Sequence, residues 1–515
     1  MRQFDSMTSE ESPSPDRAMQ RSLRTILPDN SRRPSLQVPN PGRSYPLGAA
    51  YDEMFASNGL VREPFLELHA GIEGLGAEEL RRRQQACELS FLHQGITFTV
   101  YGDDQRTERI IPTDLLPRII AHSEWKRIEA GLKQRVRALN FFLHDIYGDG
   151  RVLKDGLIPR ALIHGSKHYR REMRGVPAPH GAYVNVCGTD LVRREDGVFV
   201  VLEDNLRVPS GVSYMLANRD VVRRAFPTVF RSARVSAIEH YPQELLETLK
   251  SLAPQQDEPS IVVLSPGVFN SAYFEHAFLA RHMGVELVEG RDVVVNDNAV
   301  YARTTSGLKR IDVIYRRIDD DFMDPLAFRS DSSLGVPGVF NAYRAGNVVI
   351  ANAPGTGIAD DKAVYAYVPR LIRYYLAEEP ILESVQTFLC REPAALSHVL
   401  ANLDKLVVKA VGESGGYGML VGPQASRAER ESFAEKIRSD PENYIAQPTI
   451  QLSTAPCFVD GQIEPRHVDL RPFVLQGART SIVPGALTRV ALKRGSLVVN
   501  SSQGGGSKDT WVLSG

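Results

Sequence analysis

The spacing of hydrophobic residues changes along the chain and predicts both helices and strands. From Trp125 to Gly148, apolar residues recur at three- and four-residue steps, which is typical of an amphipathic helix with a glycine stop. Residues 181–211 instead contain two alternating runs joined by Asp196-Gly197, a dipeptide typical of a two-residue β-hairpin turn. The apolar positions of the helix are Ile128, Leu132, Val136, Leu139, Leu143 and Ile146.

The second half of the chain predicts a mixed α/β (α+β) protein. Residues 261–265, 272–283 and 285–290 have the pattern strand, helix, strand, which indicates an α/β layer. Further short strands are expected at 311–316, 347–352 and 406–411, and a helix over 363–376 is preceded by Asp360 and Asp361. The last hundred residues are rich in strand patterns.

Composition limits the classes of partner. The 515 residues include 61 Lys and Arg against 62 Asp and Glu, so the net charge of -1 supplies no field that would hold nucleic acid or an anionic membrane. No apolar run is long enough for a transmembrane helix. The four cysteines lack metal-site spacing and are expected to be reduced, buried thiols of a cytoplasmic protein.

Two carboxylates share one face of the predicted hairpin. A two-residue turn at Asp196-Gly197 sets Asp190 opposite Glu203 and Gly188 opposite Asn205. Like charges facing each other across two strands repel, so a cation between them is expected, and oxygen ligands of this kind suit Mg²⁺. A solvated sheet edge with neutralising arginines nearby explains the same spacing, and the pattern leaves both interpretations open.

A lysine and a run of glycines form a second candidate site. Lys409 ends an apolar strand, and a glycine-rich loop follows it. Such a loop lets backbone N–H groups approach phosphate oxygens. Lys362 follows two good N-cap residues, in a position where a bound anion would be favoured. The alternatives are an ordinary glycine turn and an exposed surface lysine. The glycines are Gly412, Gly415, Gly416 and Gly418.

Several long blocks in one order resemble a known family, the circularly permuted ATP-grasp proteins related to glutathionylspermidine synthase. The resemblance covers roughly residues 48–513 and implies a circularly permuted ATP-grasp fold with an inserted or adjacent α/β lobe. The metal strand precedes the lysines here, which is the reverse of an unpermuted ATP-grasp chain. The blocks are residues 203–219, 265–292, 313–322, 407–419, 444–450 and 499–512.

The resemblance implies a set of ligands and residues. Asp190, Glu203 and Asn205 match Mg²⁺ ligands, with Glu203 expected to bridge two ions. Lys362 and Lys409 match lysines that bind ATP phosphates. The glycines 412–418 match a flap over the triphosphate, and Gln447 matches a residue beside the adenine; Arg471 is a further candidate nucleotide contact.

One position departs from the family pattern. The synthase-like pattern has an arginine two residues before the first metal ligand, where this chain has Gly188. Arg207 and Arg316 are therefore the candidates for the charge that binds the substrate carboxylate or the transferring phosphoryl group, because a guanidinium binds such groups with two nitrogens.

By this resemblance the expected activity is that of an ADP-forming carboxylate–amine ligase that forms an acyl phosphate from a small-molecule or peptide acid. An ATP-dependent phosphotransferase and a catalytically silent nucleotide-binding scaffold are the alternatives. No protein partner is identified. The expected division is a Pro-, Ser- and Arg-rich flexible tail, a helical region with the metal hairpin, an α/β lobe and a nucleotide lobe, at residues 1–46, 47–235, 236–355 and 356–515.

Overall fold

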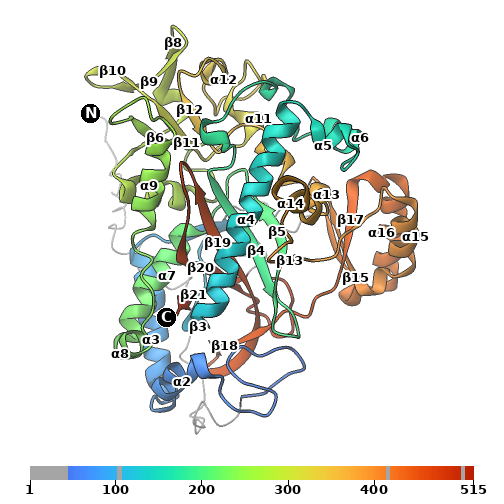
Figure 1. Ribbon diagram of the computed structural model, residues 1–515. Helices are drawn as coiled ribbons and strands as arrows, with labels where there is room; N and C mark the ends of the chain where they lie inside the picture. The colour runs from blue at the N-terminus through green and yellow to red at the C-terminus, as the bar shows by residue number, and fades with distance from the viewer. Residues whose placement is uncertain (1–44, 101–106, 413–417, 500–504) are drawn as a thin grey trace, which may run out of the picture.

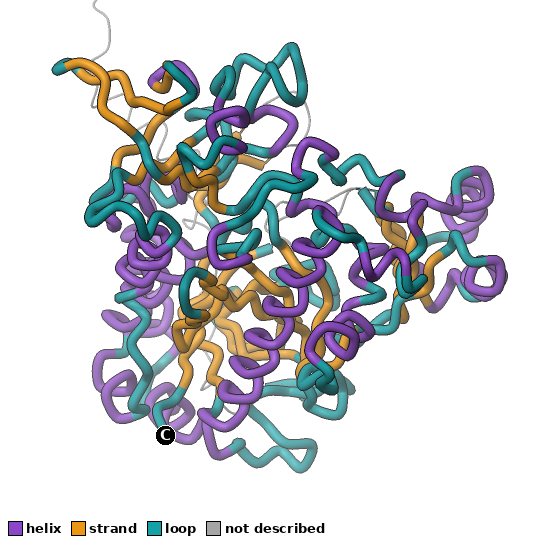
Figure 2. The backbone as a smooth tube through the Cα atoms, turned by 45° about the horizontal axis from the view of Figure 1, so that its top comes forward, coloured by secondary structure: helices purple, strands orange, loops and turns teal. Residues whose placement is uncertain are grey.

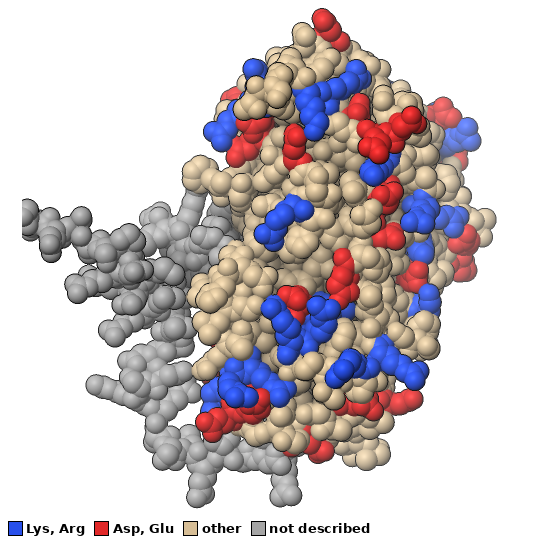
Figure 3. Space-filling model, turned by 90° about the vertical axis from the view of Figure 1, so that its left-hand side faces the viewer, with Lys and Arg blue, Asp and Glu red and all other residues tan. Residues whose placement is uncertain are grey.

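The structure is a computed structural model, and it describes residues 45–100, 107–412, 418–499 and 505–515. The predicted N-terminal tail therefore lies almost wholly outside the described residues. Acidic and basic side chains lie interspersed on the face shown in Figure 3, as expected from the near-zero net charge. None of the described helices is both long and apolar enough to cross a bilayer.

The largest sheet joins strands from both ends of the chain. Its main path runs β13-β5-β4-β19-β20-β21-β3, and β18 pairs with β19 beside it. Figure 1 shows this sheet at the centre of the molecule. Its strands are β3 (Thr113–Ile120), β4 (Val186–Arg193), β5 (Phe199–Asn205), β13 (Glu383–Ser384), β18 (Thr454–Val459), β19 (Gln462–Gln476), β20 (Thr480–Val490) and β21 (Gly506–Val512).

Helices cover both faces of the large sheet, so its strands are sandwiched between two hydrophobic cores (Figure 2). Helix α4 (His122–Tyr147) packs on one face, where Leu139 belongs to the same core as Leu470 of β19. Helix α7 (Val212–Ala225) packs on the other face, where Met215 belongs to the same core as Phe473. The predicted amphipathic helix is confirmed, and it begins three residues before Trp125.

A smaller parallel sheet follows in the chain, with strand order β12-β11-β6-β7. Every strand of this layer and its helix α10 (Tyr273–Met283) were predicted from the sequence. A three-stranded sheet, β10-β9-β8, lies beside it at the top of Figure 1. The strands are β6 (Ile261–Leu264), β7 (Glu286–Val288), β8 (Val293–Asn296), β9 (Ala299–Thr304), β10 (Gly307–Arg310), β11 (Val313–Arg316) and β12 (Val349–Ala351).

A third sheet has its own small core. Strands β14 (Phe388–Leu389), β17 (Tyr444–Pro448), β15 (Leu406–Ala410) and β16 (Met419–Val421) pair in that order. Helices α15 and α16 contribute to its core, and the unit stands at the right of Figure 1. The remaining helices and strands are α2 (Leu66–Glu73), α3 (Ala77–His93), β1 (Thr97–Val100), β2 (Thr107–Ile110), α5 (Arg151–Lys154), α6 (Arg160–His164), α8 (Pro227–Ser232), α9 (Tyr241–Ser251), α11 (Asp320–Met323), α12 (Val339–Arg344), α13 (Lys362–Tyr365), α14 (Val368–Leu376), α15 (Pro393–Ala401) and α16 (Arg427–Ser439).

The helix predicted over residues 363–376 is divided into two. The short helix α13 ends at Tyr365, and α14 begins at Val368 with Pro369 in its first turn. A proline lacks the N–H that an uninterrupted helix needs, but it is well accommodated near a helix start. The prediction of one continuous helix was therefore wrong.

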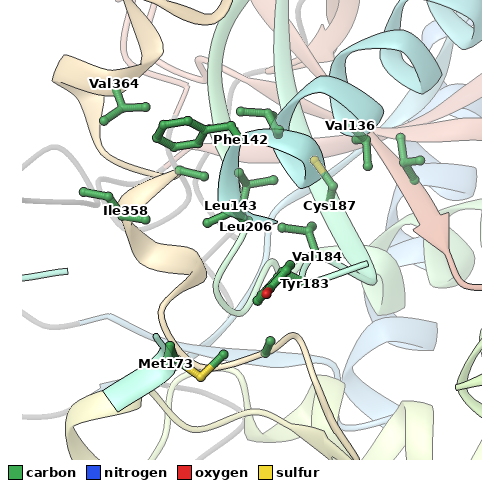
Figure 4. Packing of buried hydrophobic residues seen from close by; sticks show 14 of the residues in the cluster. Val136, Phe142, Leu143, Met173, Tyr183, Val184, Cys187, Leu206, Ile358 and Val364 are labelled. Carbon is green, nitrogen blue, oxygen red and sulfur yellow. The ribbon is translucent and has the colours of Figure 1, made fainter. Parts of the chain in front are cut away.

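The largest core cluster connects the segment that carries Lys362 to the β4–β5 hairpin. Figure 4 shows Phe142 and Leu143 of α4 in one cluster with Cys187 of β4 and with Ile358 and Val364, which lie on either side of Lys362. This packing holds the lysine segment against the back of the hairpin. The four cysteines Cys87, Cys187, Cys390 and Cys457 are free and buried, as the sequence predicts.

Candidate active site

The β4–β5 hairpin places its acidic residues in the predicted register. Asp190 pairs with Glu203, and Gly188 pairs with Asn205. The turn itself was wrongly predicted, because Arg194 N donates to Val198 O at 3.0 Å and closes a three-residue loop that contains Gly197. The loop is one residue longer than predicted, and a β-bulge between Asp190 and Leu191 compensates for this extra residue. Beyond the bulge, the residues therefore pair as they would across a two-residue turn.

Two arginines from the neighbouring strands hold Asp190. Arg471 donates from Nε and Nη2 to the two carboxylate oxygens at 2.5 Å and 2.8 Å, and Arg489 Nη2 donates at 2.6 Å. Burial would raise the pKa of the Asp190 carboxyl, but these guanidinium groups hold it well below its usual range. Arg489 also binds Asp469, which pairs with it across β19 and β20.

Glu203 has a different electrostatic environment. Burial and the negative charge of Asp190 raise the pKa of Glu203, while Lys409 and Lys362 oppose this rise. The carboxylate would therefore gain from an added cation. Asn205 lies two residues further along the same face of β5, and its Nδ2 is buried without a hydrogen-bond partner within the described part of the chain.

These residues fit a divalent cation. Asp190, Glu203 and Asn205 offer carboxylate and amide oxygens on one face, which is the kind of ligand that Mg²⁺ prefers. The described residues contain no group of three or more His, Cys, Asp or Glu placed to hold a metal ion. The predicted set has an asparagine as its third member and is therefore not a group of this kind. The alternative interpretation was a solvated sheet edge with arginines that neutralise the carboxylates. Two such arginines are present at Asp190, but β4 lies in the interior of the sheet and Asp190 is buried.

The two predicted lysines come from different parts of the fold to the same cavity. Lys409 lies on β15, and its Nζ donates to Gln447 Oε1 at 2.8 Å. Burial lowers the pKa of Lys409, partly opposed by Glu203. Lys362 is the first residue of α13, whose N-cap Asp361 accepts from Ala363 N at 2.8 Å. Because α13 has only four residues, the lysine charge rather than a helix dipole is the relevant feature.

A cavity of about 160 Å³ lies between the large sheet and the third sheet. Its charged and amide-bearing lining consists of Asp190, Glu203, Lys362, Lys409, Gln447, Asp469 and Arg489. Its apolar lining includes Val407, Met419, Val421, Leu452, Leu497 and Val499. The cavity therefore offers charged groups for a polyanion and apolar side chains for an aromatic ring.

The predicted glycine flap is only partly described. Strands β15 and β16 pair antiparallel on its two sides, with Lys409 opposite Met419. Gly412 and Gly418 lie at its ends, and Gly418 has a positive φ of 65°. Gly415 and Gly416 lie outside the described residues.

Gln447 lies against a phosphate-binding candidate in this structure. Its Oε1 accepts from Lys409, and its Nε2 donates to Thr387 Oγ1 at 3.1 Å. The amide is thus used at both ends and orients the lysine. The position beside the adenine, which the family resemblance implies for Gln447, stays a prediction.

The two candidate catalytic arginines have different surroundings. Arg207 Nε donates to Asp360 at 2.9 Å and its Nη1 to Asp319 at 3.2 Å, and Asp360 lines a small cavity with Glu203 and Lys362. Arg316 is fully buried and does not line that cavity. Its guanidinium pairs with Asp320 and donates to the backbone carbonyls of Asn352, Ile318 and Ala353.

The space beside Gly188 is crossed by Arg471. A Cβ built on Gly188 would lie 3.4 Å from Arg471 Cδ, so the arginine side chain passes directly over the glycine. The synthase-like pattern has an arginine at position 188. In this chain Arg471 of β19 brings a positive charge close to the same place.

Sequence reasoning did not predict Asp469 and Arg489 as site residues. Arg489 reaches Asp190, and Asp469 reaches Arg489, because β19 lies beside β4 and β20 lies beside β19, far from β4 in the chain. The only available signal was that both residues lie within strand-like runs.

Comparisons with known proteins agree with this architecture. Residues 117–491 match the model of the circularly permuted ATP-grasp type 2 family, and the chain belongs to this family. The family and the fold expected from the sequence are confirmed. A solved glutathione synthetase-like effector of Globodera pallida has the same fold, with a TM-score of 0.54 and 10% identity over 85% of this chain and 98% of that chain.

Relatives differ in length. An uncharacterized protein of Synechocystis is 54% identical over 92% of this chain and 99% of its own length. A Frankia alni protein named "Putative glutamate–cysteine ligase 2-3" is 44% identical over 90% of this chain. The match covers 54% of that protein, so the chain corresponds to about half of it.

Proposed function

We propose that the protein is an ATP-dependent, ADP-forming carboxylate–amine ligase that works through an acyl phosphate. The observation that carries this proposal is the meeting of Asp190, Glu203, Lys362 and Lys409 around one cavity between two sheets. ATP has a flat aromatic base and a polyanionic end, and the cavity offers apolar side chains and cationic groups to match them.

Each polar residue then has a role toward the triphosphate. Lys362 and Lys409 bind phosphate oxygens, and Gln447 holds the ammonium group of Lys409 in place. Asp190, Glu203 and Asn205 would hold Mg²⁺ through their side-chain oxygens. The metal, when bound, neutralises charge on the triphosphate. The glycine segment from Gly412 to Gly418, with Gly415 and Gly416 at its centre, would exclude water from the phosphates.

The reaction needs cations more than a protein nucleophile. A substrate carboxylate oxygen forms a bond to the γ-phosphorus while the bond to ADP breaks. An amine then attacks the carbonyl carbon, phosphate leaves and the amine loses a proton. Both reactants of the first step are anionic, so positioning and charge neutralisation lower the barrier.

Arg207 is the arginine retained for this step, whereas the donors of Arg471 are directed to Asp190 and to the carbonyl of Ser210. Arg471 crosses Gly188 beside Asp190, and Arg207 binds Asp360 at the Lys362 side of the site. Arg316 is not retained, because its donors are directed to Asp320 and to backbone carbonyls.

The substrates are proposed by class. An amino acid or peptide supplies the carboxylate, and a second small molecule supplies the amine. L-glutamate and L-cysteine are the first probes to use, since the name of the Frankia relative refers to them. We also propose a cytoplasmic location, which the four free and buried cysteines support.

The test is hydroxamate formation with ATP, Mg²⁺, hydroxylamine and a panel of amino acids and dipeptides that includes L-glutamate. We expect hydroxamate and ADP in equal amounts, and loss of both in Lys409→Met. The matched control is Lys309→Met, which removes an exposed lysine of β10. A stable phosphorylated product without hydroxamate would instead identify a phosphotransferase, and MgATP binding without turnover of any acid would identify a scaffold.

A further inference from the structure

Thr449 has a buried hydroxyl group whose lack of a partner in the part of the chain that the structure describes suggests a ligand. The residue lines the cavity, and its Oγ1 is buried without a hydrogen-bond partner among the described residues. A buried hydroxyl that lacks a partner costs free energy unless water or a ligand satisfies it. No role for this residue followed from the sequence or from the family resemblance.

The backbone places Thr449 at the apolar end of the cavity. Gln447, two residues earlier, reaches Lys409, whereas Thr449 N donates to Lys405 O at 3.1 Å, just before β15 begins. Each residue of an extended chain advances about 3.3 Å, so Thr449 lies roughly 7 Å further from the phosphate lysine than Gln447 along the segment.

The residues around this end are suited to a flat apolar ring. Val407 pairs with Val421 across β15 and β16, two residues beyond Lys409 and Met419, and with Gln447 across β15 and β17. The cavity lining opposite includes Leu452, Leu497 and Val499, which come from the C-terminal part of the chain. A purine placed between these side chains would have its six-membered ring farthest from the triphosphate, because the ribose joins the five-membered ring.

We propose that the Thr449 hydroxyl accepts a hydrogen bond from the 6-amino group of the bound adenine. This inference rests on the proposed function, because it assumes that the cavity binds MgATP. The hydroxyl is the polar group at an otherwise apolar wall, so it would orient the base and favour a purine with a donor at position 6. Thr449 is thus a specificity residue for the nucleotide, whereas Gln447 positions Lys409.

The experiment compares two nucleotides that differ in one group. The dissociation constants of MgATP and of magnesium purine riboside 5′-triphosphate, which lacks the 6-amino group, are measured by calorimetry. The proteins are the unaltered chain, Thr449→Val and Thr449→Ser. Valine keeps the shape of threonine without the hydroxyl, and serine keeps the hydroxyl. Thermal unfolding of each protein checks that the variants are folded, and inorganic tripolyphosphate probes the phosphate end alone.

We expect the unaltered protein to prefer MgATP by about threefold to tenfold, the effect of one neutral hydrogen bond. Thr449→Val should lose this preference through weaker MgATP binding, with purine riboside triphosphate and tripolyphosphate unchanged. Thr449→Ser should keep it. Equal weakening of both nucleotides, or no weakening of either, would overturn the inference. Failure of the unaltered protein to bind MgATP at all would instead contradict the proposed function.

Discussion

Arg471 on β19 binds both carboxylate oxygens of Asp190 on β4 while its aliphatic stem lies over Gly188. A side chain at position 188 would compete with that stem for space. The glycine and the arginine are therefore complementary across two neighbouring strands. This relationship explains how a buried aspartate remains ionised in a sheet where a glutamate faces it.

Arg471→Met is expected to lower the free energy of unfolding by about 2 kcal/mol. The loss should be smaller than that of a buried charge left without any partner, because Arg489 still binds Asp190 at 2.6 Å. Urea denaturation measures the change. Arg479→Met removes an exposed arginine just beyond the same strand and should cost less than about 0.5 kcal/mol. Equal losses in the two variants would refute the structural role of Arg471.

Glu203→Gln is expected to abolish ATP turnover while leaving the free energy of unfolding unchanged or slightly higher. Glutamine keeps the shape of the side chain and removes the repulsion with Asp190, which contributes to the raised pKa of Glu203. ADP release and urea denaturation are the two measurements. Normal turnover in this variant would remove Glu203 from the proposed metal set.

Gln447→Leu is expected to weaken MgATP binding about tenfold, because Lys409 loses the amide oxygen that orients its ammonium group. The preference for adenine should stay, since the base is assigned to Thr449. Calorimetry with MgATP and inorganic tripolyphosphate should show similar losses for both ligands. Gln462→Leu, at the exposed start of β19, is the matched control. A loss confined to MgATP would instead place Gln447 beside the base.

The buried Glu53 is expected to make stability depend on pH in the acid range. Burial alone would raise the pKa of Glu53, but Arg118 and Arg193 lower it to about 2. A carboxyl whose pKa is lower in the folded than in the unfolded state stabilises the fold above the unfolded value. That contribution is lost as the pH falls from about 4.5 toward 2.

Glu53→Gln should therefore lower the free energy of unfolding by about 3 kcal/mol at pH 7, and the difference from the unaltered chain should shrink as the pH falls. Urea denaturation at a series of pH values measures this. Glu67→Gln, an exposed glutamate near the same segment, should give a curve parallel to that of the unaltered protein. A constant difference for Glu53→Gln at every pH would contradict the linkage.

Local patterns in the chain were sufficient for most of the elements around the site. Helix α4, the strands of the parallel layer and strand β15 with Lys409 at its polar end all follow from periodicity. The opposition of Asp190 and Glu203 also follows from the spacing of two alternating runs. That register depended on a compensating bulge that spacing does not reveal.

Contacts between distant segments lay beyond such patterns. Hydrophobic periodicity reports which face of an element is buried, and it carries no information on which strand pairs beside another. The placement of β19 next to β4, with β20 beside β19, gave Asp190 its two arginines, and the loops at the end of the parallel sheet surrounded Arg316 with carbonyl groups. The sequence thus determined the chemical character of each side chain. Its partners were decided by the long-range packing of sheets whose strands are distant in the chain.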